Sequence, residues 1–197
     1  RHMREYLSVL VPLLEQGAVS YSGETIRTEA AIGVDPRPAC PVLVAVHIPG
    51  NFSKSFAERL AGRCACPVEE AVSGARLVPG KVLVAPGGLQ TRVVRHATGL
   101  GVEVDQSPPE LLYRPSIDFL FTSVAGAAPG ALGVVLTGMG NDGTQGARAL
   151  ITAGGSVWAQ DEASSVVFGM PGSVIKAGLA SEVLSLTDLG ARLARGR

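Results

Sequence analysis

Residues 131–143 read ALGVVLTGMGNDG, and this stretch decides the predicted fold. Its first six residues are apolar and uncharged, which predicts a short buried strand of a parallel sheet. A glycine-rich turn follows, and residues 144–155, TQGARALITAGG, have the apolar spacing of a helix. A strand, a glycine-rich turn and a helix in this order place side chains at the carboxyl edge of an α/β sheet, where ligands bind.

The glycine-rich turn has two interpretations. Gly138-x-Gly140-x-x-Gly143 fits the pattern of a dinucleotide-binding loop, with Asp161 after the next apolar run as the acid that would bind a ribose. Alternatively, Asp142 is itself a reacting or orienting group. A carboxylate inside the turn would repel a pyrophosphate and compete for the helix N-terminus that a phosphate needs.

The rest of the chain alternates strands and helices, which predicts a doubly wound α/β fold with a mostly parallel sheet flanked by helices and one inserted β-hairpin. The predicted strands are residues 25–32, 41–47, 68–72, 81–86, 131–136, 155–159 and 182–186, with the hairpin at 91–96 and 101–105. The predicted helices cover residues 4–16, 53–63, 117–125 and 144–155, and two more begin near Pro171 and Thr187. Ser53, Ser55 and Ser116 are expected to cap helices.

Composition narrows the classes of function. The 17 basic and 17 acidic residues cancel, so charge favours neither nucleic acid nor an anionic membrane as a partner. No apolar run reaches the roughly 20 residues of a membrane-spanning helix, and no signal peptide is visible. The three cysteines are expected to be small reduced thiols. These features predict a cytoplasmic protein without membrane insertion or a metal site.

Two chemically active side chains fall at the same predicted edge of the sheet. His47 ends the strand at 41–47, and Asp142 follows the strand at 131–136. A histidine held by a carboxylate is the general-base part of a nucleophilic hydrolase. The glycines on both sides of Met139 would leave its backbone N–H free to bind an oxyanion. The alternative is structural, with His47 ending a strand and Asp142 capping a helix.

Five blocks of the sequence resemble the catalytic domain of the chemotaxis protein-glutamate methylesterase (CheB) family, in family order. The blocks are VLVAVHIPGNFSKSFAERL, EAVSGARLVPGKVLVAPGG, RPSIDFLFTSVA, GVVLTGMGNDGTQGARAL and AQDEASSVVFGMP. The resemblance implies a doubly wound α/β domain with a Ser-His-Asp triad and no cofactor. It implies hydrolysis of γ-glutamyl methyl esters on the cytoplasmic helices of methylated chemoreceptors, with deamidation of glutamines in many members.

The resemblance also implies roles for individual residues. His47 matches the family's catalytic histidine, Asp142 its aspartate, and Met139 the residue whose backbone helps to bind the oxyanion. The family often carries an upstream receiver domain that covers the site, so such a domain is an expected partner. We expect a tag remnant and a linker-like helix in residues 1–20 and one catalytic domain in residues 21–197, with no receiver domain in the chain.

The nucleophile is where the chain departs from the family. The family's serine lies in a motif of the form I-G-x-S-T-G-G, but Ile32-Gly33-Val34 is followed by Asp35-Pro36-Arg37-Pro38, and Ser-Thr-Gly-Gly occurs nowhere in the chain. If the strands at 25–32 and 41–47 were parallel neighbours, their connection would also be too short for a crossover helix. One hypothesis is that the 197-residue sequence omits the segment with the serine. The other is a genuine deletion, which leaves a receptor-binding or protein-binding module without activity.

Overall fold

A computed structural model describes residues 18–22, 27–31 and 38–194 of the chain. Its strands are β1 Ala18–Ser22, β2 Arg27–Ala31, β3 Val42–Val44, β4 Val68–Glu70, β5 Arg76–Leu77, β6 Val82–Val84, β7 Gln90–His96, β8 Gly99–Asp105, β9 Leu132–Val135, β10 Ser156–Gln160 and β11 Glu182–Leu184. Its helices are α2 Gly50–Ala61, α3 Ile117–Ala127, α4 Thr144–Thr152, α5 Met170–Lys176 and α6 Leu186–Ala194. None of the described helices is long and apolar enough to cross a membrane.

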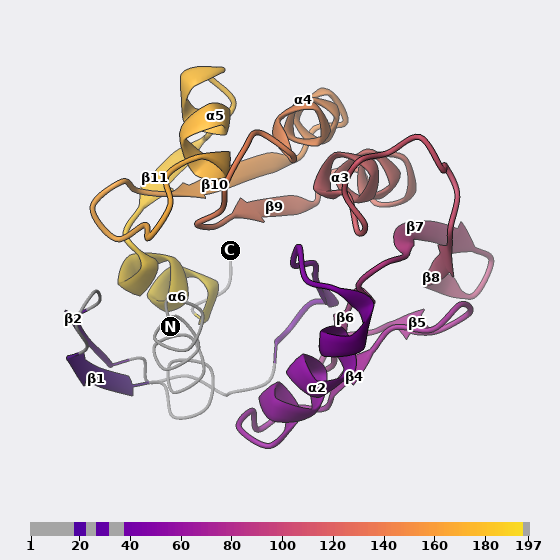
Figure 1. The fold of residues 1–197 in the computed structure, drawn as a ribbon, viewed down its shortest axis with the longest axis horizontal. Helices are drawn as coiled ribbons and strands as arrows, with labels where there is room; N and C mark the ends of the chain where they lie inside the picture. The colour runs from indigo at the N-terminus through magenta and orange to yellow at the C-terminus, as the bar shows by residue number, and fades with distance from the viewer. Residues whose placement is uncertain (1–17, 23–26, 32–37, 195–197) are drawn as a thin grey trace.

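The two main sheets are parallel, as the alternation of strands and helices predicted. One has the order β3-β6-β4 and the other β11-β10-β9, and all four pairings are parallel. Helices α4 and α5 connect the strands of the second sheet and lie on one side of it, with α6 on the other side (Figure 1). The predicted hairpin is also confirmed, because β7 and β8 pair antiparallel and β5 joins them as a third strand.

Helix α3 connects the parts of the fold that carry the site. It packs against α4 on one side and against β7 of the hairpin on the other. One apolar core contains Val135, Leu150 and Val157 between the second sheet and its helices, and a second contains Leu83 and Val102 beside the hairpin. Ala45, just after β3, packs against both cores. The segment that leads to His47 therefore lies where the two cores meet.

Strand β3 differs from its prediction in length and burial. The sequence predicted a buried strand from residue 41 to His47, but β3 ends at Val44 and its three residues are only half-buried. Among the described strands β3 has one neighbour, β6, so one of its edges is uncovered by that sheet. His47 consequently lies three residues beyond the strand, in the connection to α2.

The start of α2 also differs from its prediction. The helix begins at Gly50 with Pro49 as the N-cap residue, not at Ser53 or Ser55. A side chain at Gly50 would place its Cβ 2.7 Å from the carbonyl oxygen of Gly87, so only glycine allows the loop and the helix start to approach so closely. Ser53 is instead fully buried within α2 and donates a hydrogen bond to Glu70 Oε1 at 2.6 Å.

The strand predicted over residues 25–32 appears as β2, which pairs antiparallel with β1 and not with β3. No crossover is therefore needed between β2 and β3 in this pairing. The hypothesis of a lost segment then rests on the missing Ser-Thr-Gly-Gly motif alone. The helix predicted over residues 4–16 and the residues after Ala31 that would carry the motif lie outside the described part of the chain.

Candidate active site

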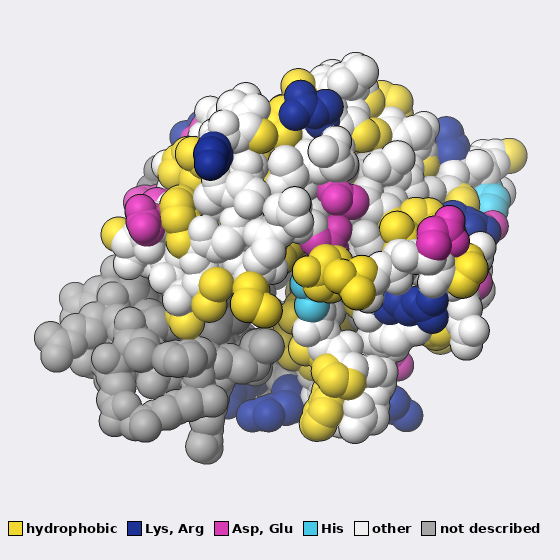
Figure 2. Space-filling view, turned by 45° about the horizontal axis from the view of Figure 1, so that its top comes forward, with side chains coloured by type: hydrophobic (Ala, Val, Ile, Leu, Met, Phe, Trp, Pro, Cys, Tyr) yellow, Lys and Arg dark blue, Asp and Glu magenta, His cyan; other side chains and the backbone are white. Residues whose placement is uncertain are grey.

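The structure brings together the predicted histidine and aspartate. Asp142 Oδ2 lies 2.8 Å from His47 Nε2, although 95 residues separate them in the sequence. The His47 side chain is 25% exposed, whereas that of Asp142 is 3% exposed. In Figure 2 a histidine side chain reaches the surface near the middle of the face, beside apolar side chains and below acidic ones. The pair thus has a buried acid and a base that solvent and substrate can reach.

Asp142 is fixed by the N-terminus of α3 as well as by His47. Its Oδ2 accepts the Ile117 N–H at 2.7 Å, and its Oδ1 accepts the Asp118 N–H at 2.9 Å and the Ser116 hydroxyl at 3.1 Å. Burial acts to raise the pKa of Asp142, but the hydrogen bonds from His47 and from the start of α3 outweigh it and hold the pKa below its ordinary value. Asp142 is therefore ionised near neutral pH.

An ionised Asp142 determines which nitrogen of His47 carries the proton. A carboxylate only accepts hydrogen bonds, so the neutral imidazole must donate from Nε2. Nδ1 is then the nitrogen with the free lone pair, and it is the atom that can take a proton. The geometry therefore supplies a general base held in one tautomer, which is what proton abstraction from a hydroxyl nucleophile requires.

A second carboxylate links α3 to α4. Asp118 Oδ1 accepts the Gly146 N–H at 2.8 Å, at the start of α4. Burial raises the pKa of Asp118, the hydrogen bond from Gly146 lowers it, and the nearby charge of Asp142 raises it, with a net pKa above the ordinary value. Asp142, just before α4, therefore caps α3, while Asp118 of α3 caps α4.

The turn with Met139 is held by the loop before α5. Gly138 N donates to Val167 O at 3.0 Å, and Gly138 O accepts the N–H groups of Gly169 and Met170 at 3.0 and 2.8 Å. Gly140 has a φ of +87°, a conformation that favours glycine. The backbone of residues 167–170 therefore fixes this turn.

Met139 itself lies on the same turn as Asp142, and its side chain is 80% exposed. Its predicted part in the site depends on its backbone N–H and not on this side chain. The binding of an oxyanion by that N–H stays a prediction.

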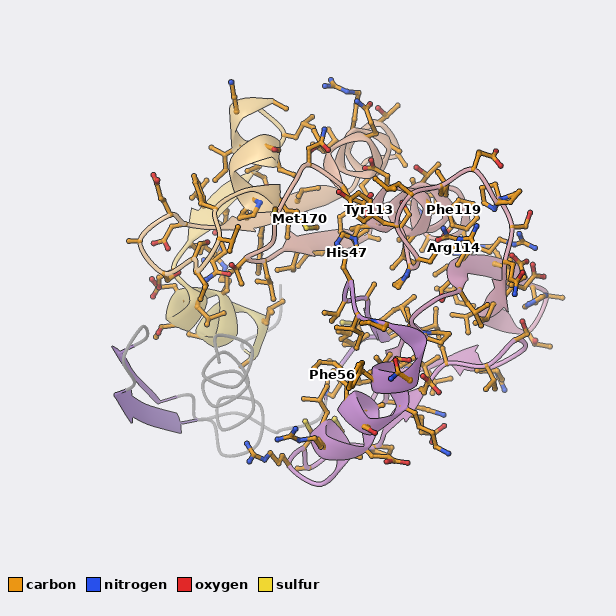
Figure 3. All side chains as sticks on the ribbon, viewed as in Figure 1. His47, Phe56, Tyr113, Arg114, Phe119 and Met170 are labelled. Carbon is orange, nitrogen blue, oxygen red and sulfur yellow. The ribbon has the colours of Figure 1, made fainter. Side chains whose placement is uncertain are left out.

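Two residues near His47 were missed by sequence reasoning. The ring of Tyr113 stacks on the His47 imidazole, and Figure 3 shows the two residues next to each other. Gln90, which is buried, donates from Nε2 to the Tyr113 carbonyl at 2.8 Å and accepts the Ser116 N–H at 2.9 Å. The sequence holds no local signal for this arrangement, because the partners of Gln90 lie more than 20 residues away.

The dinucleotide interpretation of the glycine-rich turn is not favoured by the geometry. The start of α4, where a pyrophosphate would bind, already receives the Asp118 carboxylate through Gly146 N. Asp161, the candidate ribose acid, accepts hydrogen bonds from the backbone and hydroxyl of Ser164 within its own loop.

Comparison with known proteins gives one consistent family. A sequence model of CheB methylesterase matches residues 24–193. A protein-glutamate methylesterase/protein-glutamine glutaminase of Maricaulis maris is 48% identical over 169 residues, which cover 84% of this chain and 41% of the relative. One of Chromohalobacter salexigens is 44% identical over 187 residues, which cover 92% of this chain and 53% of the relative. The chain thus spans about half or less of the length of these relatives.

The fold gives the same answer. The crystal structure of the Thermotoga maritima CheB methylesterase catalytic domain superimposes with a TM-score of 0.75 at 36% identity, over 79% of this chain and 82% of that one. The mostly parallel sheets flanked by helices agree with the fold class predicted from sequence. The chain belongs to the CheB methylesterase family.

Proposed function

We propose that this chain is the catalytic part of a carboxylic-ester hydrolase that removes methyl groups from γ-glutamyl esters of a chemoreceptor. The observation that carries the proposal is the His47–Asp142 pair, in which four donors fix the carboxylate and the base is partly exposed. The relatives are named protein-glutamate methylesterase/protein-glutamine glutaminase, which supports the same reaction and adds deamidation of glutamine. Both reactions proceed by attack on a γ-carbonyl carbon and differ only in the leaving group.

His47 and Asp142 divide the work as follows. Nδ1 of His47 takes the proton of a serine hydroxyl as its oxygen attacks the carbonyl carbon, and Asp142 stabilises the imidazolium that forms. The backbone N–H of Met139 donates to the oxyanion of the tetrahedral intermediate. The imidazolium then gives its proton to the departing methoxide, and methanol leaves. Water, activated by the same base, hydrolyses the acyl-enzyme.

The serine for this reaction comes from the family motif that begins at Ile32-Gly33. We place it in a segment between Gly33 and Pro38 that the 197-residue sequence does not contain, and this stretch lies outside the described residues. The proposed substrate is the methylated cytoplasmic helices of a receptor, and the proposed location is the cytoplasm. An upstream receiver domain is the proposed regulatory partner.

Two measurements test the proposal together. The intact mass of the purified protein should exceed that of the 197 residues by the mass of the missing segment. The protein should release methanol from a methylated receptor fragment, and His47→Ala should reduce this release by about 10⁶-fold with an unchanged unfolding midpoint. Methanol release at the wild-type rate in His47→Ala would refute the role of the base.

A specific observation favours a second function, namely the absence of Ser-Thr-Gly-Gly from the chain. If the mass equals that of 197 residues and no methanol appears, the chain is a receptor-binding module without hydrolase activity. Saturable binding of the receptor fragment would then identify it as such.

A further inference from the structure

The His47 and Tyr113 rings lie face to face. Their centroids are 4.5 Å apart and their planes differ by 11°. The hydrogen bond to Asp142 holds the Nε2 atom of His47, and rotation about the Cβ–Cγ bond can still change the plane of the imidazole ring. An aromatic ring against its face restricts this rotation and adds the favourable energy of a stacked pair. Tyr113 therefore fixes what the hydrogen bond leaves free, the plane of the ring.

The backbone of Tyr113 is itself held by a buried side chain, that of Gln90. Gln90 is 1% exposed and bonds both the Tyr113 carbonyl and the Ser116 N–H. Ser116 in turn donates its hydroxyl to Asp142. Residues 113–116 thus supply the ring that covers His47 and one of the donors that hold Asp142. The same short segment therefore helps to hold both His47 and Asp142.

The other end of Tyr113 reaches the turn that carries Met139. Its hydroxyl oxygen is the nearest atom to the place where a Cβ on Gly140 would stand, at 3.2 Å. Gly140 directly follows Met139, so the Tyr113 side chain extends from the imidazole to this turn. The side chain is half-buried, its ring lies against His47, and the backbone carbonyl of the residue is held by Gln90.

We propose that Tyr113 is a positioning residue for His47. Its ring holds the imidazole plane so that Nδ1 points at the reacting hydroxyl while Nε2 stays on Asp142. The proposal rests on the hydrolase function proposed above. Tyr113 acts through His47 and contacts no reacting atom in this role, so the ring and not the hydroxyl is the part that matters.

The first test needs no activity and uses the full chain labelled with ¹⁵N. His47 should show one neutral tautomer, protonated at Nε2, and its ring protons should give nuclear Overhauser effects to the Tyr113 ring. Tyr113→Phe keeps an aromatic ring, so the His47 spectrum of this variant should keep both the single tautomer and the inter-ring nuclear Overhauser effects. Tyr113→Leu should keep this tautomer, which Asp142 determines, but should broaden the His47 ring signals because the plane of the ring is no longer fixed. A wild-type protein without the inter-ring effects overturns the proposal.

The second test separates kcat from KM for methanol release from a methylated receptor fragment. Tyr113→Leu should lower kcat by about 10- to 100-fold with KM unchanged, the size expected for a misplaced catalytic group. Tyr113→Phe should keep the wild-type kcat. The neighbouring Leu112→Ala, which truncates a side chain that is 85% exposed, serves as the matched control and should also keep it.

Three results of the second test overturn the proposal: an unchanged kcat in Tyr113→Leu, an equal loss in Tyr113→Phe, or a loss confined to KM. If Tyr113→Leu does not fold, Tyr113→Met removes the ring at similar volume and takes its place. A wild-type protein that releases no methanol contradicts the proposed hydrolase function alone, because the spectroscopic test still decides whether Tyr113 positions His47.

Discussion

Asp142 has its two oxygens bonded in different directions. Oδ2 takes the His47 and Ile117 donors, and Oδ1 takes those of Asp118 and Ser116. Replacing the carboxylate by an amide exchanges one of these oxygens for an NH₂ group, which cannot accept a hydrogen bond. If that group faces His47, the imidazole must present a lone pair at Nε2 and moves its proton to Nδ1, which then cannot serve as the base.

Asp142→Asn is therefore expected to lower kcat for methanol release by up to about 10⁴-fold, as in other triads whose histidine takes the wrong tautomer. The measurement is steady-state kinetics with KM determined separately, and ¹⁵N spectra of His47 report the tautomer directly. Asp188→Asn, on α6 and far along the chain, is the matched control and should keep its activity. A full kcat in Asp142→Asn would show that the pair is structural.

The sequence was sufficient to name His47 and Asp142 but not what surrounds them. Both residues follow strands, and the carboxyl ends of parallel strands meet at one edge, so their proximity could be predicted. The contacts of Gln90 with Tyr113 and Ser116 join segments 23 and 26 residues apart. Such contacts depend on how the hairpin packs beside α3, which no local pattern contains.

At the scale of elements, helices α3 and α4 cap each other. Asp142 precedes α4 and accepts from the start of α3, whereas Asp118 in the first turn of α3 accepts from Gly146 at the start of α4. Each carboxylate interacts favourably with the positive end of the other helix. Two like charges are brought close by this arrangement, and the pKa of Asp118 is raised by burial and by Asp142, whereas that of Asp142 is lowered.

The raised pKa of Asp118 predicts how Asp118→Asn changes stability with pH. A pKa that is higher in the folded chain means that ionisation of Asp118 lowers the free energy of unfolding. This loss is absent below the unfolded pKa of about 3.9, and it is complete once the pH exceeds the folded pKa. Asparagine keeps an oxygen for Gly146 N and removes the charge. Asp118→Asn should therefore unfold in more urea than the wild type at pH 7, and the difference should shrink as the pH falls through 4.

Asp118→Ala is the control for this comparison. It removes the acceptor as well as the charge, and loss of a cap costs about 0.5 to 2 kcal/mol of unfolding free energy. It should therefore be less stable than Asp118→Asn at pH 7. An Asp118→Asn protein that is less stable than the wild type at pH 7 would contradict the raised pKa of Asp118.

The elements themselves were mostly predictable, and the errors have physical causes. Ser116 was predicted as the N-cap of α3, and its hydroxyl does accept the Phe119 N–H. Ser53 and Ser55 were wrongly predicted to cap α2 because a capping pattern takes no account of tertiary contacts. The close approach of Gly50 to Gly87 starts the helix earlier, and Ser53 is then buried against β4 through Glu70.

At the scale of the whole molecule, the site lies where two three-stranded sheets come together. His47 follows β3 of one sheet, and Asp142 follows β9 of the other. Among the described strands, β3 and β9 are each at an edge of their sheet, with one neighbour apiece. The sequence predicted one parallel sheet flanked by helices, but the order of its strands depends on pairings between distant segments and was not predicted.

The edge position of β3 makes a prediction that concerns the nucleophile. Strand β6 has neighbours on both sides and contains Leu83 and Val84, which are 1% and 0% exposed, whereas β3 is half-buried. In a protein of 197 residues, amides of Val42–Val44 that point away from β6 should exchange with deuterium before those of β6.

If the purified protein is heavier and carries a further strand-forming segment after Gly33, that segment can pair with β3. The β3 amides should then be protected as well as those of β6, and hydrogen exchange resolved by residue, measured on the sample whose intact mass is known, distinguishes the two cases. Equal protection at a mass of 197 residues would contradict the edge position of β3.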